Sequence, residues 1–291
     1  MRIIATRRLP GPAWDDLPEH EIAPLADADG AEVLVVANEE VDLDRFPLLG
    51  LIANYGVGYD RIDADACRAR GVAVTNTPGV LDAATADLAF ALILAARRRL
   101  VEGDRLVRAG GWATGWSGGP FLGREVSGAT LGIVGLGRIG AAVARRAAAF
   151  DMRVLHHRRT PGGDGYRALD DLLAEADVVT LHTPLTPETT GLLSRERLAL
   201  LRDGTTLVNT ARGAIVDEDA LVAELVAGRI DAGLDVFVHE PHVPQALLGL
   251  PNVVLAPHIG SATVETRGAM TRVVVDNVLA YVRGEPLVTP I

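Results

Sequence analysis

The stretch Thr130-Leu131-Gly132-Ile133-Val134-Gly135-Leu136-Gly137-Arg138-Ile139-Gly140 predicts a buried strand, a glycine-rich turn and the start of a helix. Its three glycines fit the spacing G-x-G-x-x-G. In such a turn the first glycine permits a tight bend, the second lets the backbone approach a pyrophosphate, and the third lets helix and strand pack closely. Glycine is common here, 31 of 291 residues, so the spacing alone is a weak signal. The strand before it and the helix after it favour a dinucleotide site over a plain structural turn.

Composition excludes several classes of protein. The chain has 291 residues, of which 48% are hydrophobic, so it is long enough to bury the cores of two domains. The longest apolar run, 88–96, is far shorter than the roughly 20 residues that span a bilayer. The first residues lack the apolar core of a signal peptide, and a single cysteine, Cys67, excludes an internal disulfide framework and a cysteine metal cluster. We therefore expect a cytoplasmic protein, and the histidines indicate no metal site.

The net charge and the basic residues exclude further kinds of binding and catalysis. The net charge is −10, which argues against a general binder of nucleic acid or of anionic membranes. The sequence contains no lysine, so all 28 basic residues are arginine. Schiff-base chemistry and a phosphate-binding lysine are therefore excluded. Any anion must be held by arginine, histidine or backbone N–H groups.

Short apolar runs alternate with helical segments along the whole chain. Strands are expected at 2–5, 33–37, 51–54, 72–75, 131–134, 153–156, 178–181, 206–209, 230–234 and 253–255. Helices are expected at 139–150, 169–174, 194–201, 218–227 and 261–282, and over 81–109 with a break near 97–100. Asp217 and Ser194 are natural N-caps for two of them. The pattern predicts an α/β protein with two doubly wound, Rossmann-like domains and parallel sheets.

Ionisable residues follow three of the expected strands directly. Arg212 lies in 208–213, Glu240 in 233–241 and His258 in 254–261. Because doubly wound sheets bind ligands at the carboxyl ends of their strands, these side chains are candidates for proton transfer beside an anionic substrate. The pattern alone leaves other roles open. Arg212 could form a surface ion pair, His258 could make a core hydrogen bond, and Glu240 could face solvent, as could His239 and His242.

The sequence resembles the D-isomer-specific 2-hydroxyacid dehydrogenases over nearly its whole length. The motifs that carry the resemblance lie at 56–60 (GVGYD), 76–79 (NTPG), 84–87 (ATAD), 135–140 (GLGRIG), 182–184 (HTP), 209–213 (NTARG), 235–241 (DVFVHEP) and 257–260 (PHIG). The resemblance implies a reversible, NAD(P)H-dependent reduction of a small 2-oxoacid, of the glyoxylate or hydroxypyruvate type, to the D-2-hydroxyacid. It also implies an active-site cleft between the two domains.

The resemblance assigns roles to individual residues. Arg212 would bind the substrate carboxylate and the adjacent carbonyl, together with the backbone N–H groups of Val57 and Gly58. His258 would donate a proton to the carbonyl oxygen and accept it in the reverse direction. Glu240 would orient His258 and stabilise its imidazolium form.

Val238 and His182 also lie in the motifs that carry the resemblance. The family normally has Glu at the position of Val238, but this departure leaves Glu240 in the catalytic position. His182 is interpreted as structural.

The resemblance also implies a cofactor site, with Asp235 at the nicotinamide end. The full set is Thr85, Gly137, Arg138, Ile139, Arg158, Arg159, Thr160, Thr183, Pro184, Thr189, Thr210, Ala211, Asp235, His258 and Gly260. NAD-preferring domains end their second strand with Asp or Glu, whereas this sequence has Arg158, Arg159 and Thr160 there. Two guanidinium groups and a hydroxyl suit a 2′-phosphate, so we expect NADP(H) to be favoured over NAD(H).

Domain boundaries and partners are expectations of the same kind. Residues 1–93 and 265–291 would form the substrate-binding domain, and residues 94–264 the NAD(P)-binding domain. The family implies a homodimer. Trp112 and Trp116 lie on a glycine-rich stretch, and they could contact a partner or cover the chain's own surface. The alternatives are a dehydrogenase of another small anion, such as phosphoglycerate or phosphite, and a non-catalytic protein that senses the cofactor.

Overall fold

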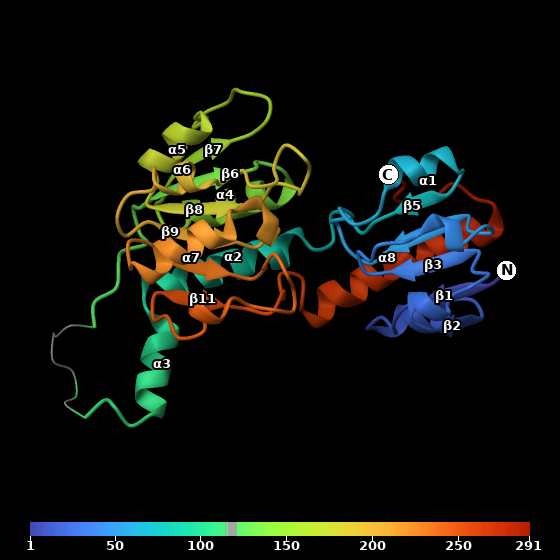
Figure 1. The fold of residues 1–291 in the computed structure, drawn as a ribbon, viewed down its shortest axis with the longest axis horizontal. Helices are drawn as coiled ribbons and strands as arrows, with labels where there is room; N and C mark the ends of the chain where they lie inside the picture. Colours follow the sequence, from blue (N-terminus) through green and yellow to red (C-terminus); the bar gives the residue numbers. More distant parts are fainter. Residues whose placement is uncertain (114, 116–120) are drawn as a thin grey trace. The chain divides into compact units, whose positions relative to one another are not determined.

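A computed structural model describes residues 1–113, 115 and 121–291. The chain forms two compact units, one of residues 1–84 and 261–291 and the other of residues 85–260 (Figure 1). Each unit is built on one parallel sheet, which confirms the predicted fold class. Within the described residues, no helix is both long and apolar enough to cross a membrane.

The first unit contains a five-stranded sheet in the order β2-β1-β3-β4-β5. Its strands are β1 (Ile3–Ala5), β2 (His20–Ile22), β3 (Val33–Val36), β4 (Leu51–Asn54) and β5 (Ala73–Thr75). The helices are α1 (Ala64–Ala69) and α8 (Val264–Arg283), with short 3₁₀ turns at Pro12–Asp16, Leu25–Asp27 and Leu43–Arg45. Buried β-branched and aliphatic residues such as Ile4, Leu34 and Ile52 form its core.

The second unit contains a six-stranded sheet in the order β11-β10-β9-β8-β6-β7. Its strands are β6 (Thr130–Val134), β7 (Arg153–His157), β8 (Val178–Leu181), β9 (Thr206–Asn209), β10 (Asp231–Leu234) and β11 (Val253–Leu255). β7 and β8 lie on opposite sides of β6, so the strand order reverses there. This switch point is where doubly wound sheets bind their ligands.

Helices cover both faces of this second sheet. The core on one face includes α2 (Asp82–Arg97) and α4 (Arg138–Ala148), and the core on the other includes α5 (Leu169–Glu175), α6 (Arg195–Leu198) and α7 (Glu218–Val226). Two 3₁₀ turns lie at Gly213–Ile215 and Gln245–Leu247. Leu131 belongs to one core and Val134 to the other, because strand side chains alternate between faces. The arrangement is doubly wound.

The predicted break in the long helical stretch is confirmed. α2 ends at Arg97 and α3 (Leu100–Arg108) follows, with Arg99 between them in a left-handed conformation at φ 52°. α3 buries none of its residues and stands off the sheet layers in Figure 1.

The structure departs from the sequence prediction at one strand and at one helix cap. The edge strand β2 was not predicted, because the three residues His20–Ile22 are polar or exposed and form no apolar run. Asp217 caps α7 by accepting a hydrogen bond from the Ala220 N–H. Ser194 is the N-cap of α6, as predicted, but its side chain accepts no hydrogen bond from the helix; its hydroxyl donates to Glu196 Oε2 at 2.7 Å.

Candidate active site

The glycine-rich turn after β6 has the geometry of a phosphate cradle. Gly135 has φ +100°, and a Cβ there would lie 2.6 Å from the His182 carbonyl carbon and 2.8 Å from the Thr183 nitrogen. A Cβ on Gly140 would lie 2.1 Å from the Gly135 oxygen. Gly137 is the N-cap of α4 and makes no side-chain cap bond, and a Cβ built on it would have no neighbouring atom within 4 Å. The turn leads into the amino end of α4, where the first N–H groups of a helix can bind a pyrophosphate.

The loop after β8 borders the same turn. The Thr189 hydroxyl donates to the Pro184 carbonyl at 2.7 Å and also accepts from the Thr186 N–H at 2.8 Å. His182 precedes Thr183 and bonds the Thr180 hydroxyl through Nε2 at 2.9 Å. Burial lowers the pKa of His182 to about 4, so its imidazole is neutral at physiological pH. A neutral ring bonded to its own strand fits the structural role expected for it.

The loops after β9 and β10 pack directly on each other. A Cβ on Gly213 would lie 2.1 Å from the Phe237 carbonyl carbon and 2.4 Å from the Val238 nitrogen, so only glycine fits without a shift. Asn209 shapes the first of these loops, since its Oδ1 accepts from the Ala211 N–H at 3.0 Å and its Nδ2 donates to the Arg212 carbonyl at 2.8 Å. The neighbouring Thr210 hydroxyl is buried without a partner among the described residues, which leaves it for a bound group.

His258 and Glu240 form a hydrogen-bonded pair on the carboxyl edge of the sheet. His258 Nδ1 lies 2.7 Å from Glu240 Oε2, and the Phe237 N–H donates to Glu240 Oε1 at 3.1 Å. Burial raises the pKa of Glu240, but the hydrogen bonds from His258 and Phe237 and the charge of Arg212 outweigh it, so the net pKa is lowered. Gly213, next to Arg212, packs against Phe237, whose N–H donates to Glu240, so the loops that carry the three predicted catalytic residues are adjacent.

Asp235 anchors the turn that carries His258. Its side chain is fully buried and accepts from the Ile259 N–H at 2.7 Å and the Gly260 N–H at 2.8 Å. Burial raises its pKa, and these two hydrogen bonds oppose that effect. A Cβ on Gly260 would lie 3.3 Å from Asp235 Oδ2 and 3.6 Å from Thr85 Oγ1. Three of the expected cofactor-binding residues, Thr85, Asp235 and Gly260, therefore form one cluster.

Arg158, Arg159 and Thr160 lie apart from that cluster, just beyond β7. All three are exposed, and Arg158 Nη2 donates to the Gly162 carbonyl at 2.9 Å. The charge of Arg159 acts on Glu188 in the loop after β8. β7 is the neighbour of β6 in the sheet. Residues just beyond β7 therefore suit the adenosine end of a dinucleotide whose pyrophosphate would lie at the turn after β6.

Val57 and Gly58 belong to the first unit, in the loop after β4. Asn54 Nδ2 donates to the carbonyls of Gly56 at 3.2 Å and Gly58 at 2.8 Å, and Asn76 Nδ2 donates to the Val57 carbonyl at 2.9 Å. With these carbonyls held, the Val57 and Gly58 N–H groups have no partner among the described residues and can bind an anion. The roles of Asn54, Asn76 and Asn209 were not predicted; the signal is an asparagine at or just beyond the end of a buried strand.

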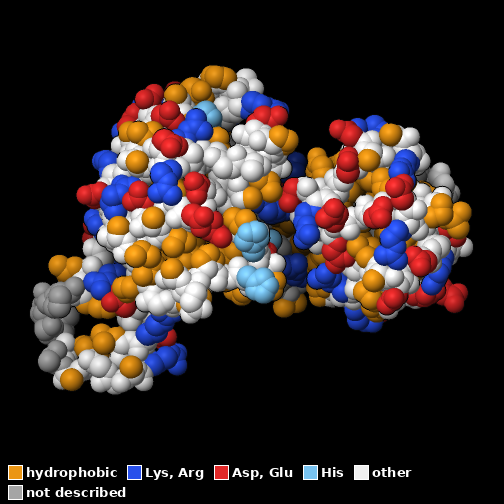
Figure 2. Space-filling model, viewed as in Figure 1, with side chains coloured by type: hydrophobic (Ala, Val, Ile, Leu, Met, Phe, Trp, Pro, Cys, Tyr) orange, Lys and Arg blue, Asp and Glu red, His pale blue; other side chains and the backbone are white. Residues whose placement is uncertain are grey.

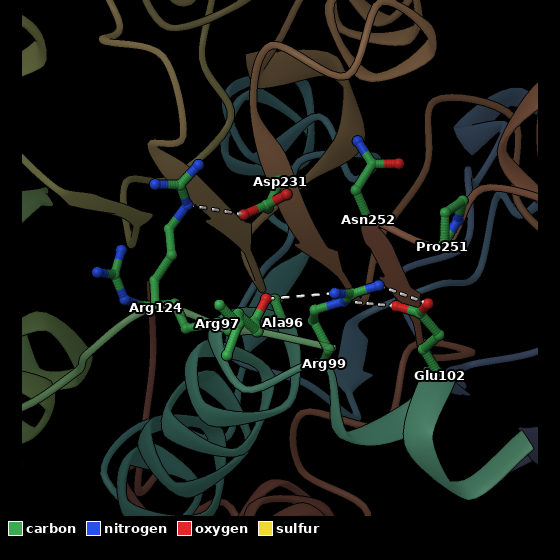
Figure 3. Close-up of a pocket in the computed structure, with 10 residues that line it drawn as sticks. Ala96, Arg97, Arg99, Glu102, Arg124, Asp231, Pro251 and Asn252 are labelled. Atoms are coloured by element: carbon green, nitrogen blue, oxygen red, sulfur yellow. Dashed lines mark hydrogen bonds and ion pairs between the residues drawn. The ribbon is translucent and has the colours of Figure 1, made fainter. Parts of the chain in front are cut away.

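A cavity lies elsewhere in the second unit, at the amino ends of β10 and β11 (Figure 3). It has a volume of about 420 Å³, and its charged groups pair internally. Arg99 donates twice to Glu102, at 2.7 Å each, and Arg124 lies 3.7 Å from Asp231. Arg97 donates to the carbonyls of Glu125 and Asp177. None of the predicted site residues lines it.

Known proteins resemble this chain throughout. The model of the D-isomer specific 2-hydroxyacid dehydrogenase NAD-binding domain matches residues 90–260. A glyoxylate reductase from Pyrococcus furiosus is 48% identical over 267 residues, which is 87% of this chain and 80% of that protein. A solved structure of a Thermus thermophilus protein covers 100% of both chains at 47% identity and a TM-score of 0.94.

A second solved structure carries a cofactor. It is an NADPH-dependent glyoxylate/hydroxypyruvate reductase from Sinorhizobium meliloti in complex with NADP and malonate. It is 37% identical, has a TM-score of 0.90, and the match covers 100% of this chain and 96% of that one. With the glycine turn, the His258–Glu240 pair and these matches together, the chain belongs to the D-isomer specific 2-hydroxyacid dehydrogenases, oxidoreductases that bind a nicotinamide cofactor.

Proposed function

We propose that this enzyme reduces small 2-oxoacids of the glyoxylate and hydroxypyruvate type to D-2-hydroxyacids, reversibly and with NADPH as the favoured cofactor. The 2.7 Å pair between His258 and Glu240, within reach of the Arg212 charge, is the observation that carries the proposal. A related enzyme from Pyrococcus furiosus is named a glyoxylate reductase, which supports the choice of substrate. Residues 85–260 would bind the cofactor, and the unit of residues 1–84 and 261–291 would supply the loop for the substrate carboxylate.

The residues would divide the reaction as follows. Arg212 and the N–H groups of Val57 and Gly58 hold the carboxylate of the 2-oxoacid. The nicotinamide cofactor, when bound, supplies the hydride. His258, whose Nδ1 is engaged by Glu240, presents Nε2 to the carbonyl oxygen and donates the proton; in the reverse direction it accepts the proton. Glu240 stabilises the imidazolium that this step requires. A protein that only senses the cofactor would have no need of this set.

The preference for NADPH rests on Arg158, Arg159 and Thr160. Their position beyond β7 normally holds the acid that binds the ribose hydroxyls of NAD. Charge-assisted hydrogen bonds contribute about 1.5–3 kcal/mol each, and the exposure of both arginines places this site at the lower end. We expect kcat/KM to be at least about tenfold higher with NADPH than with NADH. Arg158→Asp should remove most of that ratio, and a clear preference of the wild type for NADH would contradict it.

The homodimer expected from the family would form through α3 and the segment after it. Apolar side chains there are unusually exposed, including Leu100 at 63%, Val107 at 57%, Trp112 at 59% and Leu122 at 73%. Figure 2 shows apolar side chains at the surface where Figure 1 places α3. Exposed apolar patches of this kind mark interaction sites. Trp116 lies outside the described residues. Light scattering on the purified protein tests the proposal, and a monomer would contradict it.

Replacing Arg212 tests the catalytic assignment. Arg212→Ala should raise KM for glyoxylate and lower kcat/KM at least about a hundredfold, because it removes a bidentate charged contact to the substrate. Arg195→Ala, at an exposed arginine of α6, is the matched control and should retain full activity. Unchanged reduction of glyoxylate by Arg212→Ala would show that the roles are wrongly assigned.

A further inference from the structure

Asn76 holds the Val57–Gly58 loop, and Asn76 is itself held by a segment more than 200 positions later in the chain. The Thr289 hydroxyl donates to the Asn76 carbonyl at 2.6 Å. The Asn76 N–H donates in turn to the Thr289 carbonyl at 3.4 Å. Both backbone groups of Asn76 are thus bonded to one residue, and its side-chain amide is directed at the Val57 carbonyl, 2.9 Å away.

Asn277 of α8 fixes Thr289 from the other side. Its Nδ2 donates to the Thr289 hydroxyl at 2.9 Å and to the Val273 carbonyl at 2.7 Å. Its Oδ1 accepts from the N–H groups of Val288 and Thr289, both at 3.0 Å. Asn277 is fully buried, and all four hydrogen bonds of its amide are made. A saturated buried amide has one arrangement only, so it can set the position of its partners.

The segment that contains Thr289 is anchored along β5. Pro290 forms an antiparallel bridge with Thr75, and the Ile291 N–H donates to the Val74 carbonyl at 3.0 Å. The side chain of Ile291 packs against the core of the first unit. The path from α8 to the loop is therefore continuous: Asn277 to Thr289, Thr289 to Asn76, and Asn76 to Val57.

We propose that Thr289 and Asn277 are positioning residues for substrate binding. They act through Asn76 and keep the Val57 carbonyl turned inward, so that the Val57 and Gly58 N–H groups face the substrate carboxylate. This inference rests on the proposed function, in which that loop binds the carboxylate. Nothing in the loop's own sequence indicates a dependence on residues 277 and 289.

Thr289→Val provides the test, since it keeps the shape of the side chain and removes the hydroxyl that both bonds use. Thr289→Ser, which keeps the hydroxyl, is the matched control. We expect Thr289→Val to raise KM for glyoxylate about three- to tenfold, with less than about twofold change in kcat and none in the Kd of NADPH. Thr289→Ser should restore the wild-type KM. Amide hydrogen exchange of Tyr55 and Gly56, whose N–H groups donate to the Val36 and Asn54 carbonyls, is measured without ligands and should be faster in Thr289→Val only.

The readouts separate this inference from the function on which it rests. A lower Tm in Thr289→Val, with unchanged KM and unchanged exchange at Tyr55 and Gly56, would show that Thr289 is merely structural. That result would overturn the inference while wild-type glyoxylate reduction stands. Faster exchange with unchanged KM would show that the loop is positioned but does not bind the carboxylate. That result would overturn the substrate role given to Val57 and Gly58.

Discussion

Glu240→Gln is the substitution that probes the proton-transfer pair most sharply. The Phe237 N–H donates to Glu240 Oε1, so the amide oxygen of the new glutamine would remain on that donor. Its NH₂ group would then face His258 Nδ1, at the position where Oε2 now lies 2.7 Å away. A donor in that position favours a neutral imidazole and opposes the imidazolium that reduction needs.

The size of the effect follows from the pair's exposure. Charge-assisted hydrogen bonds contribute about 1.5–3 kcal/mol, and we take the lower part of that range because the two side chains are 48% and 35% exposed. A loss of about 1.5–2 kcal/mol lowers kcat/KM about 10- to 30-fold. The imidazolium form of His258 is the active one in reduction. Because Glu240→Gln disfavours that form, the variant should also move the alkaline limb of the kcat/KM profile to lower pH.

Steady-state NADPH oxidation with glyoxylate, measured across pH 5.5 to 9, checks both expectations. The double variant Val238→Glu with Glu240→Gln is the control, because it restores a carboxylate at the position where the family usually has one. It should stay as slow as Glu240→Gln. Wild-type kcat/KM and pH profile in Glu240→Gln, or rescue by the double variant, would refute the assignment of Glu240.

Two further predictions concern packing and stability. Gly213→Ala places a methyl group 2.1 Å from the Phe237 carbonyl carbon, and it should lower the free energy of unfolding by about 1–3 kcal/mol and reduce kcat/KM, whereas Gly249→Ala, with open space around it, should do neither. Equal denaturation midpoints for the two variants would contradict this. His182 has its pKa lowered to about 4 in the folded state, so only the unfolded chain gains its proton between pH 7.5 and 5, and stability falls as pH falls. The loss is about 2 kcal/mol, and His182→Gln should reduce the pH dependence by that amount in urea titrations.

The strand pattern could be predicted from the sequence because buried parallel strands are continuous apolar runs. Val33–Val36, with the sequence VLVV, is such a run, and it is entirely buried. β2 lacked that signal, because an edge strand of three residues buries too little to require apolar side chains. Ser194 shows a second limit. A capping residue can be recognised from the sequence, but whether its side chain bonds the helix N–H groups cannot; here the hydroxyl donates to Glu196 and no cap bond forms.

The proposed catalytic residues Arg212, Glu240 and His258 can be picked out in the sequence because each lies in a loop after a strand and in a recognisable motif. The residues that position them cannot, because their partners are distant in sequence. Asn76 lies in the NTPG motif at 76–79, yet the position of its side chain depends on Thr289, which is bonded to it only in the folded chain. The same holds for Gly213, whose need for glycine arises from Phe237 on another loop.

The configuration of the product formed from hydroxypyruvate tests most directly whether the enzyme reduces 2-oxoacids to D-2-hydroxyacids. The purified enzyme would be incubated with hydroxypyruvate and NADPH, and the glycerate formed would be quantified by chiral chromatography against the NADPH consumed. We expect one D-glycerate for each NADPH oxidised, and loss of the product with His258→Gln. Formation of L-glycerate, or no oxidation of NADPH by the wild type with either hydroxypyruvate or glyoxylate, would contradict this expectation.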